Sequence, residues 1–282
     1  MIQKNIDLYE QFGIPKDEDV RGELICQVLT PNLSVSENRR RPAVLILPGG
    51  GYSRTSQREG EPIALHFLLR NYAAFTLHYT CAPHSFPVAL REAAMAMRYI
   101  RENADDFDVE PSMVAAVGFS AGGHLCGMLG TMYDCAEVAD LDDADMIRPN
   151  ALALCYPVLI EEGRTHQGSF ECISGGNTAL RKRLSIEKHV RPDMPPVFLW
   201  HTRTDNCVPC RNSIIMAQAL EEAGVDFSLH IYHKGPHGLS TADDLTYPSW
   251  GMPEISQDVK KWISEMLDFF ADVGFCTVDA SR

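Results

Sequence analysis

The segment Gly118-Phe119-Ser120-Ala121-Gly122 has the residue types and the spacing of a nucleophilic serine, since it reads GxSxG. The apolar run Met113 to Phe119 predicts a buried strand before it, and the small residues up to Thr131 predict a helix after it. Flanking glycines allow the sharp turn that lifts a serine hydroxyl above the edge of a sheet. We therefore expect Ser120 to be a nucleophile; the alternative is a glycine-rich turn without chemistry.

A second glycine-rich segment, Pro48-Gly49-Gly50-Gly51-Tyr52, directly follows the apolar run Ala43 to Leu47. Acyl transfer needs backbone N–H groups that point at the forming oxyanion, and glycines let the main chain approach the substrate. We predict donors at Gly50, Gly51 and Ala121. Phosphate binding is the alternative, although the lysine of a P-loop and the GxGxxG spacing are both missing.

A serine nucleophile also needs a base and an acid that orients the base. Asp205 follows the predicted strand Val197 to His201, and His237 follows the predicted strand Phe227 to Tyr232. The carboxyl ends of parallel strands meet at one edge of a sheet, so both residues should reach Ser120. The alternative for Asp205 is to cap a following helix. Four other histidines are alternatives for the base that takes the serine proton: His124, His201, His230 and His233.

Strand and helix patterns alternate along the chain, which predicts an α/β fold with a doubly wound, mostly parallel sheet and helices on both faces. We expect one domain over residues 1–282. Further strands are predicted at 23–30, 73–79 and 151–156, and further helices at 61–70, 88–102, 211–223 and 255–270.

Two stretches fall outside this alternation. Residues 133–150 are acidic, and a solvated loop or a short helix is the ordinary interpretation. Residues 161–195 form a long insertion between two strands. The insertion is either a lid or binding loop or plain irregular structure, and the sequence favours neither.

Composition excludes several classes of protein. The chain has 282 residues, 45% of them hydrophobic, with 25 Lys and Arg against 38 Asp and Glu, a net charge of −13. This excess argues against nucleic acid as a partner and, more weakly, against a polyanionic substrate or a membrane surface. Nine scattered cysteines, including the isolated pair Cys207 and Cys210, indicate reduced thiols and not a metal site. With no secretory-type apolar run near the start, we expect a cytoplasmic protein.

Five segments together resemble a known family: PGGGY, GFSAGGH, CYPV, FLWHTRTDNCVP and GPHGLS. In this order they are similar to the α/β-hydrolase esterases of the acetyl esterase and xylan esterase-like type, over about residues 43–239. The resemblance implies a triad of Ser120, His237 and Asp205 that hydrolyses short acyl esters, often acetyl groups on carbohydrates, without cofactor or metal. One departure is Pro48, where such oxyanion loops usually carry histidine.

Several residues near these segments are candidates for substrate contact. Tyr52, Arg58 and Glu59 follow the oxyanion loop, and Tyr79, His84 and Tyr156 follow strands at the same sheet edge. For all of them, ordinary packing or loop contacts are the alternative.

Two other functions remain open from the sequence. A serine peptidase of the oligopeptidase type shares this triad, although such enzymes usually add a large propeller or cap for which 282 residues leave little room. The second alternative function is a non-catalytic interaction module, although every triad position is filled.

The expected partner is a small-molecule ester, and the chain could also form a homo-oligomer.

Overall fold

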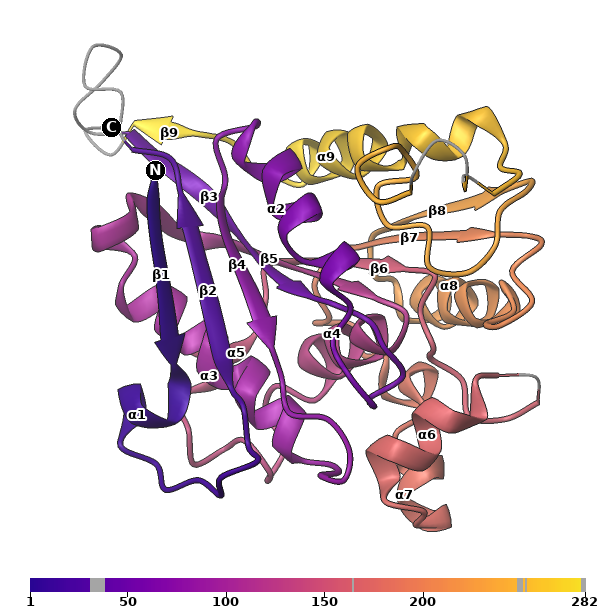
Figure 1. Ribbon diagram of the computed structural model, residues 1–282, viewed down its shortest axis with the longest axis horizontal. Helices are drawn as coiled ribbons and strands as arrows, with labels where there is room; N and C mark the ends of the chain where they lie inside the picture. Colours follow the sequence, from indigo (N-terminus) through magenta and orange to yellow (C-terminus); the bar gives the residue numbers. More distant parts are fainter. Residues whose placement is uncertain (31–38, 164, 248–250, 252, 280–282) are drawn as a thin grey trace.

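The computed structural model describes residues 1–30, 39–163, 165–247, 251 and 253–279 (Figure 1). Its strands are β1 Ile2–Asp7, β2 Glu23–Val28, β3 Arg39–Leu47, β4 Ala73–His78, β5 Val109–Phe119, β6 Ala151–Cys155, β7 Val197–Thr202, β8 Phe227–Tyr232 and β9 Val278–Asp279. Its α-helices are α1 Leu8–Phe12, α2 Glu61–Leu68, α3 Val88–Glu102, α4 Ala121–Thr131, α5 Ala144–Ile147, α6 Gln167–Ser174, α7 Thr178–Arg183, α8 Arg211–Ala223 and α9 Trp262–Asp272. Short 3₁₀ turns are η1 Gln57–Glu59, η2 Asp105–Phe107, η3 Ile186–His189 and η4 Gln257–Lys261.

The strands form one sheet in the order β1-β2-β4-β3-β5-β6-β7-β8, with β9 paired to the start of β3. Both pairings of β2 are antiparallel, and β3 to β8 pair in parallel. Helices cover both faces: α2 and α9 pack on one, and α3, α4 and α8 on the other (Figure 1). The predicted doubly wound, mostly parallel fold is confirmed.

The central strands are buried on both faces, which explains their continuous apolar sequences. Residues 43–47 of β3 are fully buried, and so are residues 114–117 of β5 beside them. Leu47 pairs with Gly118, so the two strands end side by side. The chain leaves β3 toward β4 on one side, while β5 lies on the other. This reversal is the place where parallel sheets of this type bind their ligands.

Some predicted elements differ from the structure. Strand β1 was missed, since most of its residues are polar and none is fully buried at this edge of the sheet. The final helix begins at Trp262 and not at Ile255, because residues 257–261 form the 3₁₀ turn η4. Residues 161–195, described apart from residue 164, contain α6, α7 and η3, so this insertion is largely helical and not irregular.

The acidic stretch 133–150 is tied to the body by ion pairs with arginines. Glu137 accepts two hydrogen bonds from Arg183 of α7, at 2.5 and 2.9 Å, and Asp140 pairs with Arg91 of α3. Of this stretch, residues 144–147 are helical, which agrees with the predicted short helix or loop. No helix in the described parts of the chain is both long and apolar enough to span a bilayer.

The contact between α4 and the end of β3 is unusually close at Gly122. A Cβ atom at this position would lie 2.0 Å from the Leu47 carbonyl oxygen and 2.5 Å from that of Pro48. Both neighbours are backbone atoms at the carboxyl end of β3 and cannot rotate away as a side chain can, so α4 can start here only if residue 122 has no side chain.

We predict that Gly122→Ala lowers the free energy of unfolding by about 3 kcal/mol, because the backbone must move to accept the methyl group. Denaturant unfolding followed by circular dichroism measures this. Gly168→Ala in α6 is the control: its Cβ would meet its nearest atom at 3.4 Å, and we expect a change below about 1 kcal/mol. Equal unfolding midpoints for Gly122→Ala and wild type would contradict the prediction.

Candidate active site

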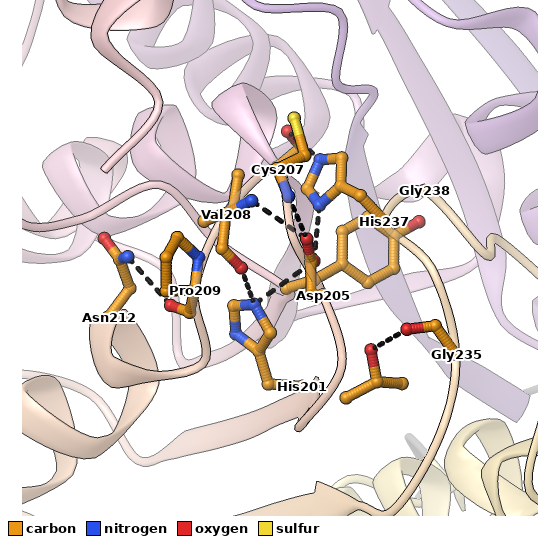
Figure 2. A network of polar contacts seen from close by, with 12 residues as sticks. His201, Asp205, Cys207, Val208, Pro209, Asn212, Gly235, His237 and Gly238 are labelled. Atoms are coloured by element: carbon orange, nitrogen blue, oxygen red, sulfur yellow. Dashed lines mark hydrogen bonds and ion pairs between the residues drawn. The ribbon is translucent and has the colours of Figure 1, made fainter. Parts of the chain in front are cut away.

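Ser120, His237 and Asp205 form a continuous chain of hydrogen bonds. The Ser120 hydroxyl oxygen lies 2.7 Å from His237 Nε2, and His237 Nδ1 lies 2.7 Å from Asp205 Oδ2. Figure 2 shows His237 reaching Asp205 from the loop that continues to Gly238. The three residues predicted from the sequence are thus brought together, in the geometry of a serine, a base and an orienting acid.

The Asp205 carboxylate is held in one orientation. Its Oδ1 accepts hydrogen bonds from the backbone N–H groups of Cys207 and Val208, at 3.0 and 2.9 Å, and its Oδ2 lies 3.4 Å from His201 Nε2 (Figure 2). Burial would raise the pKa of Asp205, but hydrogen bonds from His201 and His237 hold this pKa well below its usual range. Asp205 does not cap α8, because that helix has Cys210 at its N-cap and no side-chain cap.

Ser120 sits on a strained turn between β5 and α4. Its backbone has φ 54° and ψ −116°, which non-glycine residues rarely adopt. The backbone is fixed from both sides: Ser120 N–H donates to the Cys155 carbonyl, and its own carbonyl accepts from Val158. The hydroxyl therefore projects from the sheet edge at the N-terminus of α4, where developing negative charge is favoured.

The oxyanion loop lies beside Ser120, after β3. Gly50 and Gly51 have φ values of 127° and 67°, and their N–H groups have no acceptor among the described residues. Ala121 is the first residue of α4, so its N–H is one of the unpaired donors of that helix. The start of the loop is anchored at Pro48, whose carbonyl accepts a 2.7 Å hydrogen bond from the Tyr79 hydroxyl.

Glu59 connects this loop to the loop that carries the histidine. It is 3% exposed, and its Oε2 accepts from the Gly49 N–H at 2.9 Å. Its Oε1 accepts from the Tyr156 hydroxyl at 2.7 Å, and that hydroxyl accepts from the Ser240 N–H, three residues beyond His237. One buried carboxylate therefore holds both sides of the site in register.

A cavity of about 450 Å³ opens above Ser120 and His237. The described residues that line it are mostly small or polar: Gly50, Gly51, Ser53, Arg54, Ser56, Arg58, Glu59, Ser120, His166, Gly168, Cys172, Cys207, His237 and Gly238. Of the six predicted substrate contacts, Arg58 and Glu59 line this cavity. Since both carboxylate oxygens of Glu59 already accept hydrogen bonds, its contacts are structural ones.

The other four predicted contacts lie elsewhere, among packing or surface contacts. The buried Tyr52 hydroxyl donates to His124 Nδ1 at 2.8 Å, because His124 Nε2 carries the ring proton toward the Leu184 carbonyl. Burial lowers the pKa of His124 to about 4. Tyr79 supports Pro48, and His84 lies 3.0 Å from Asp19. Tyr156 lies beneath the site with its ring centre 5.1 Å from that of His237. The position of a residue just after a strand therefore did not predict whether its side chain lines the cavity or packs elsewhere.

His166 was missed by the sequence analysis, although the insertion that contains it was noted. It precedes α6, and its Nδ1 accepts from the Ser169 N–H at 3.2 Å. Burial and then the nearby His237 lower the pKa of His166, which favours the neutral ring, and in that form the accepting Nδ1 leaves the proton on Nε2. The insertion therefore supplies a wall of the cavity with a neutral hydrogen-bond donor.

Comparisons with known proteins identify the family of this chain. A family model described as BD-FAE matches residues 32–151, and the prolyl oligopeptidase family model matches residues 164–273. The crystal structure of an acetyl ester-xyloside bifunctional hydrolase from Caldicellulosiruptor lactoaceticus is 33% identical. It superposes with a TM-score of 0.83 and covers 96% of this chain and 97% of that one. This chain belongs to the esterases of the α/β-hydrolase superfamily.

Curated relatives of this α/β-hydrolase are longer proteins. Endo-1,4-beta-xylanase B of Butyrivibrio fibrisolvens is 34% identical over 238 residues, which are 81% of this chain and 38% of that protein. An acetylxylan esterase of Xylanibacter ruminicola is 26% identical over 267 residues, 91% of this chain and 51% of that protein. The chain thus spans about half, or less, of the length of these relatives.

We predict that Glu59→Gln in this α/β-hydrolase lowers kcat for an aryl acetate by about tenfold and changes KM less. The amide can accept from Gly49 but cannot accept from Tyr156, so a buried hydroxyl loses its partner and the two loops shift. Steady-state kinetics measures the split between kcat and KM. Glu61→Gln, an exposed acid two residues away, is the matched control and should behave as wild type. An unchanged kcat in Glu59→Gln would contradict this positioning role.

Proposed function

We propose that this protein is a cytoplasmic serine esterase that removes short acyl groups, foremost acetyl, from small carbohydrate esters. The chain of two 2.7 Å contacts from Ser120 through His237 to Asp205 is the observation that carries the proposal. The acetyl ester-xyloside hydrolase and the acetylxylan esterase among its relatives support the acetyl group and the carbohydrate. Nine free cysteines are in keeping with a reducing compartment.

The proposed mechanism has two halves. His237 Nε2 takes the proton of the Ser120 hydroxyl as its oxygen attacks the ester carbonyl, while Asp205 holds the charged imidazole. The N–H groups of Gly50, Gly51 and Ala121 stabilise the oxyanion. As the tetrahedral intermediate collapses, His237 gives the proton to the departing alcohol. Water, activated by the same histidine, then attacks the acyl-serine and releases the acid.

The cavity favours a short acyl chain. Among the described residues that line it there is no Leu, Ile, Val, Met or Phe. The nearby apolar side chains Val158, Phe170 and Ile173 pack with Tyr52 so closely that no space for a water molecule remains between them. A longer acyl chain gains affinity only by burying methylene groups against apolar surface, at about 0.8 kcal/mol each. The described residues of the cavity include no large apolar side chain against which such a chain could pack.

A peptidase activity is the second candidate, since the prolyl oligopeptidase family model matches residues 164–273. The same triad can cleave amides, but the named relatives with acetyl ester or acetylxylan activity favour esters. Comparing an aryl acetate with an aminoacyl nitroanilide separates the two. Faster cleavage of the anilide would favour the peptidase.

We expect Ser120→Ala to lower kcat/KM for 4-nitrophenyl acetate by about 10⁴-fold or more, because the acyl group then has no nucleophile to accept it. The variant should also lose labelling by a fluorophosphonate probe. Circular dichroism controls for folding, and Ser112→Ala, on the exposed part of β5, is a matched serine control. Activity of the Ser120 variant within tenfold of wild type would show that another residue is the nucleophile.

We further predict that kcat/KM is highest for acetyl and propionyl esters and falls beyond about four acyl carbons, because no Leu, Ile, Val, Met or Phe side chain is among the described residues that line the cavity and could pack against a longer chain. A series of 4-nitrophenyl esters from acetate to octanoate measures this, with the hydroxide rate of each ester as reference. A steady rise toward octanoate would assign the protein to esterases of longer acyl chains.

A further inference from the structure

Two guanidinium groups lie at the cavity, although the chain as a whole is strongly acidic. Arg54 and Arg58 both line it together with Ser120 and His237, and both arginines are exposed. Among the described residues, neither has a carboxylate within 4.0 Å of its side-chain nitrogens. The net charge of −13 therefore does not describe the local charge at the mouth of the site.

Arg58 is fixed beside the residue that follows the catalytic histidine. Its guanidinium carbon lies 4.8 Å from the ring centre of Tyr247, and the Tyr247 hydroxyl donates to the Gly238 carbonyl at 2.8 Å. A Cβ atom on Gly238 would lie 3.6 Å from a terminal nitrogen of Arg58. The Arg58 carbonyl also accepts a hydrogen bond from the Ser240 hydroxyl. The positive charge is thus held in place and is not a freely moving surface charge.

The negative charges near the cavity are already engaged. Glu59 is the one carboxylate among the described lining residues, and its two oxygens accept from the Gly49 N–H and the Tyr156 hydroxyl. The Asp205 side chain is fully buried and accepts from two backbone N–H groups and from His237. The described lining of the cavity therefore holds two guanidinium groups and a single carboxylate, both oxygens of which already accept hydrogen bonds.

The position of Arg58 also indicates which part of the ester this arginine faces. His237 must reach the oxygen of the departing alcohol in order to protonate it, so the groups next to His237 face the alcohol part of the ester and not the acyl part. Arg58 lies on that side, next to Gly238. Guanidinium groups pair best with planar or multivalent oxyanions, through two parallel N–H donors.

We propose that the cavity selects acyl esters whose alcohol part carries an anionic oxygen group, a carboxylate or a phosphate, and that Arg58, aided by Arg54, binds it. The inference rests on the proposed esterase function and adds a substrate class to it. A single anionic group on a small ester is consistent with the overall acidity of the chain, which disfavours polyanions.

Three aryl acetates test this selectivity: the neutral 4-acetoxybenzamide, 4-acetoxybenzoate and 4-acetoxyphenyl phosphate. Each kcat/KM is divided by the rate of the same ester with imidazole, a neutral nucleophile, which removes differences in intrinsic reactivity. We expect wild type to favour at least one anionic ester over the benzamide by about tenfold. The anionic ester with the higher normalised kcat/KM shows whether the site prefers a carboxylate or a phosphate. The preference should shrink between about 20 and 500 mM NaCl, since salt screens the charges.

Arg58→Gln and Arg54→Gln are each expected to lower the anionic-to-neutral ratio, Arg58→Gln by about fivefold or more. Because both rates come from the same sample, the ratio does not depend on the amount of folded enzyme. If one of the two variants does not fold, the other still tests the inference. Arg70→Gln, an exposed charge just after α2 with no ion pair among the described residues, should keep the wild-type ratio.

A wild-type ratio at or below one would overturn this inference, and so would a ratio that neither cavity variant changes. In both cases hydrolysis of the neutral ester would leave the esterase function standing. Failure of wild type to hydrolyse any of the three acetates would instead count against the esterase function itself.

Discussion

The organisation of the site depends on the close approach of α4 to the carboxyl end of β3. Only a residue without a side chain at position 122 allows that approach, because the Leu47 and Pro48 carbonyls occupy the space of a Cβ atom. The contact places the N-terminus of α4, and the strained Ser120 that precedes it, beside the glycine loop that follows β3. The predicted nucleophile and the predicted oxyanion donors are therefore neighbours, because adjacent parallel strands end side by side.

Polar contacts then connect this centre to elements that come later in the chain. Glu59 and Tyr156 join the oxyanion loop to Ser240, and the indole N–H of Trp262 in α9 donates to the Ser240 carbonyl at 2.9 Å. Trp262 itself stacks on Trp200 of β7, with ring centres 5.0 Å apart. The loop that presents His237 is thus held from the sheet and from a covering helix, although it has no regular structure of its own.

The sequence predicted the parts of this molecule that depend on local pattern. The strand, elbow and helix around Ser120 could be recognised from periodicity and glycine spacing, and α3, α4, α8 and β8 have the predicted bounds. Contacts between distant segments carry no such local signal. Glu59 was predicted as a candidate substrate contact, and nothing in the local sequence indicated that its carboxylate joins two loops. Likewise, nothing in the composition of residues 161–195 distinguished His166 as a cavity wall. Strand β1 was not predicted because this edge strand lacks the alternation of apolar and polar residues that marks a strand in a sequence.

The hydrogen bond between Ser120 and His237 joins residues 117 positions apart, whereas that between His237 and Asp205 spans 32. During synthesis the elbow and its oxyanion loop leave the ribosome well before either partner of the serine exists. A nascent chain therefore carries the Ser120 hydroxyl without its hydrogen-bond partner, and the contact forms only when the segments that follow β7 and β8 have reached the sheet edge. The geometry of the site is in this way coupled to completion of the fold.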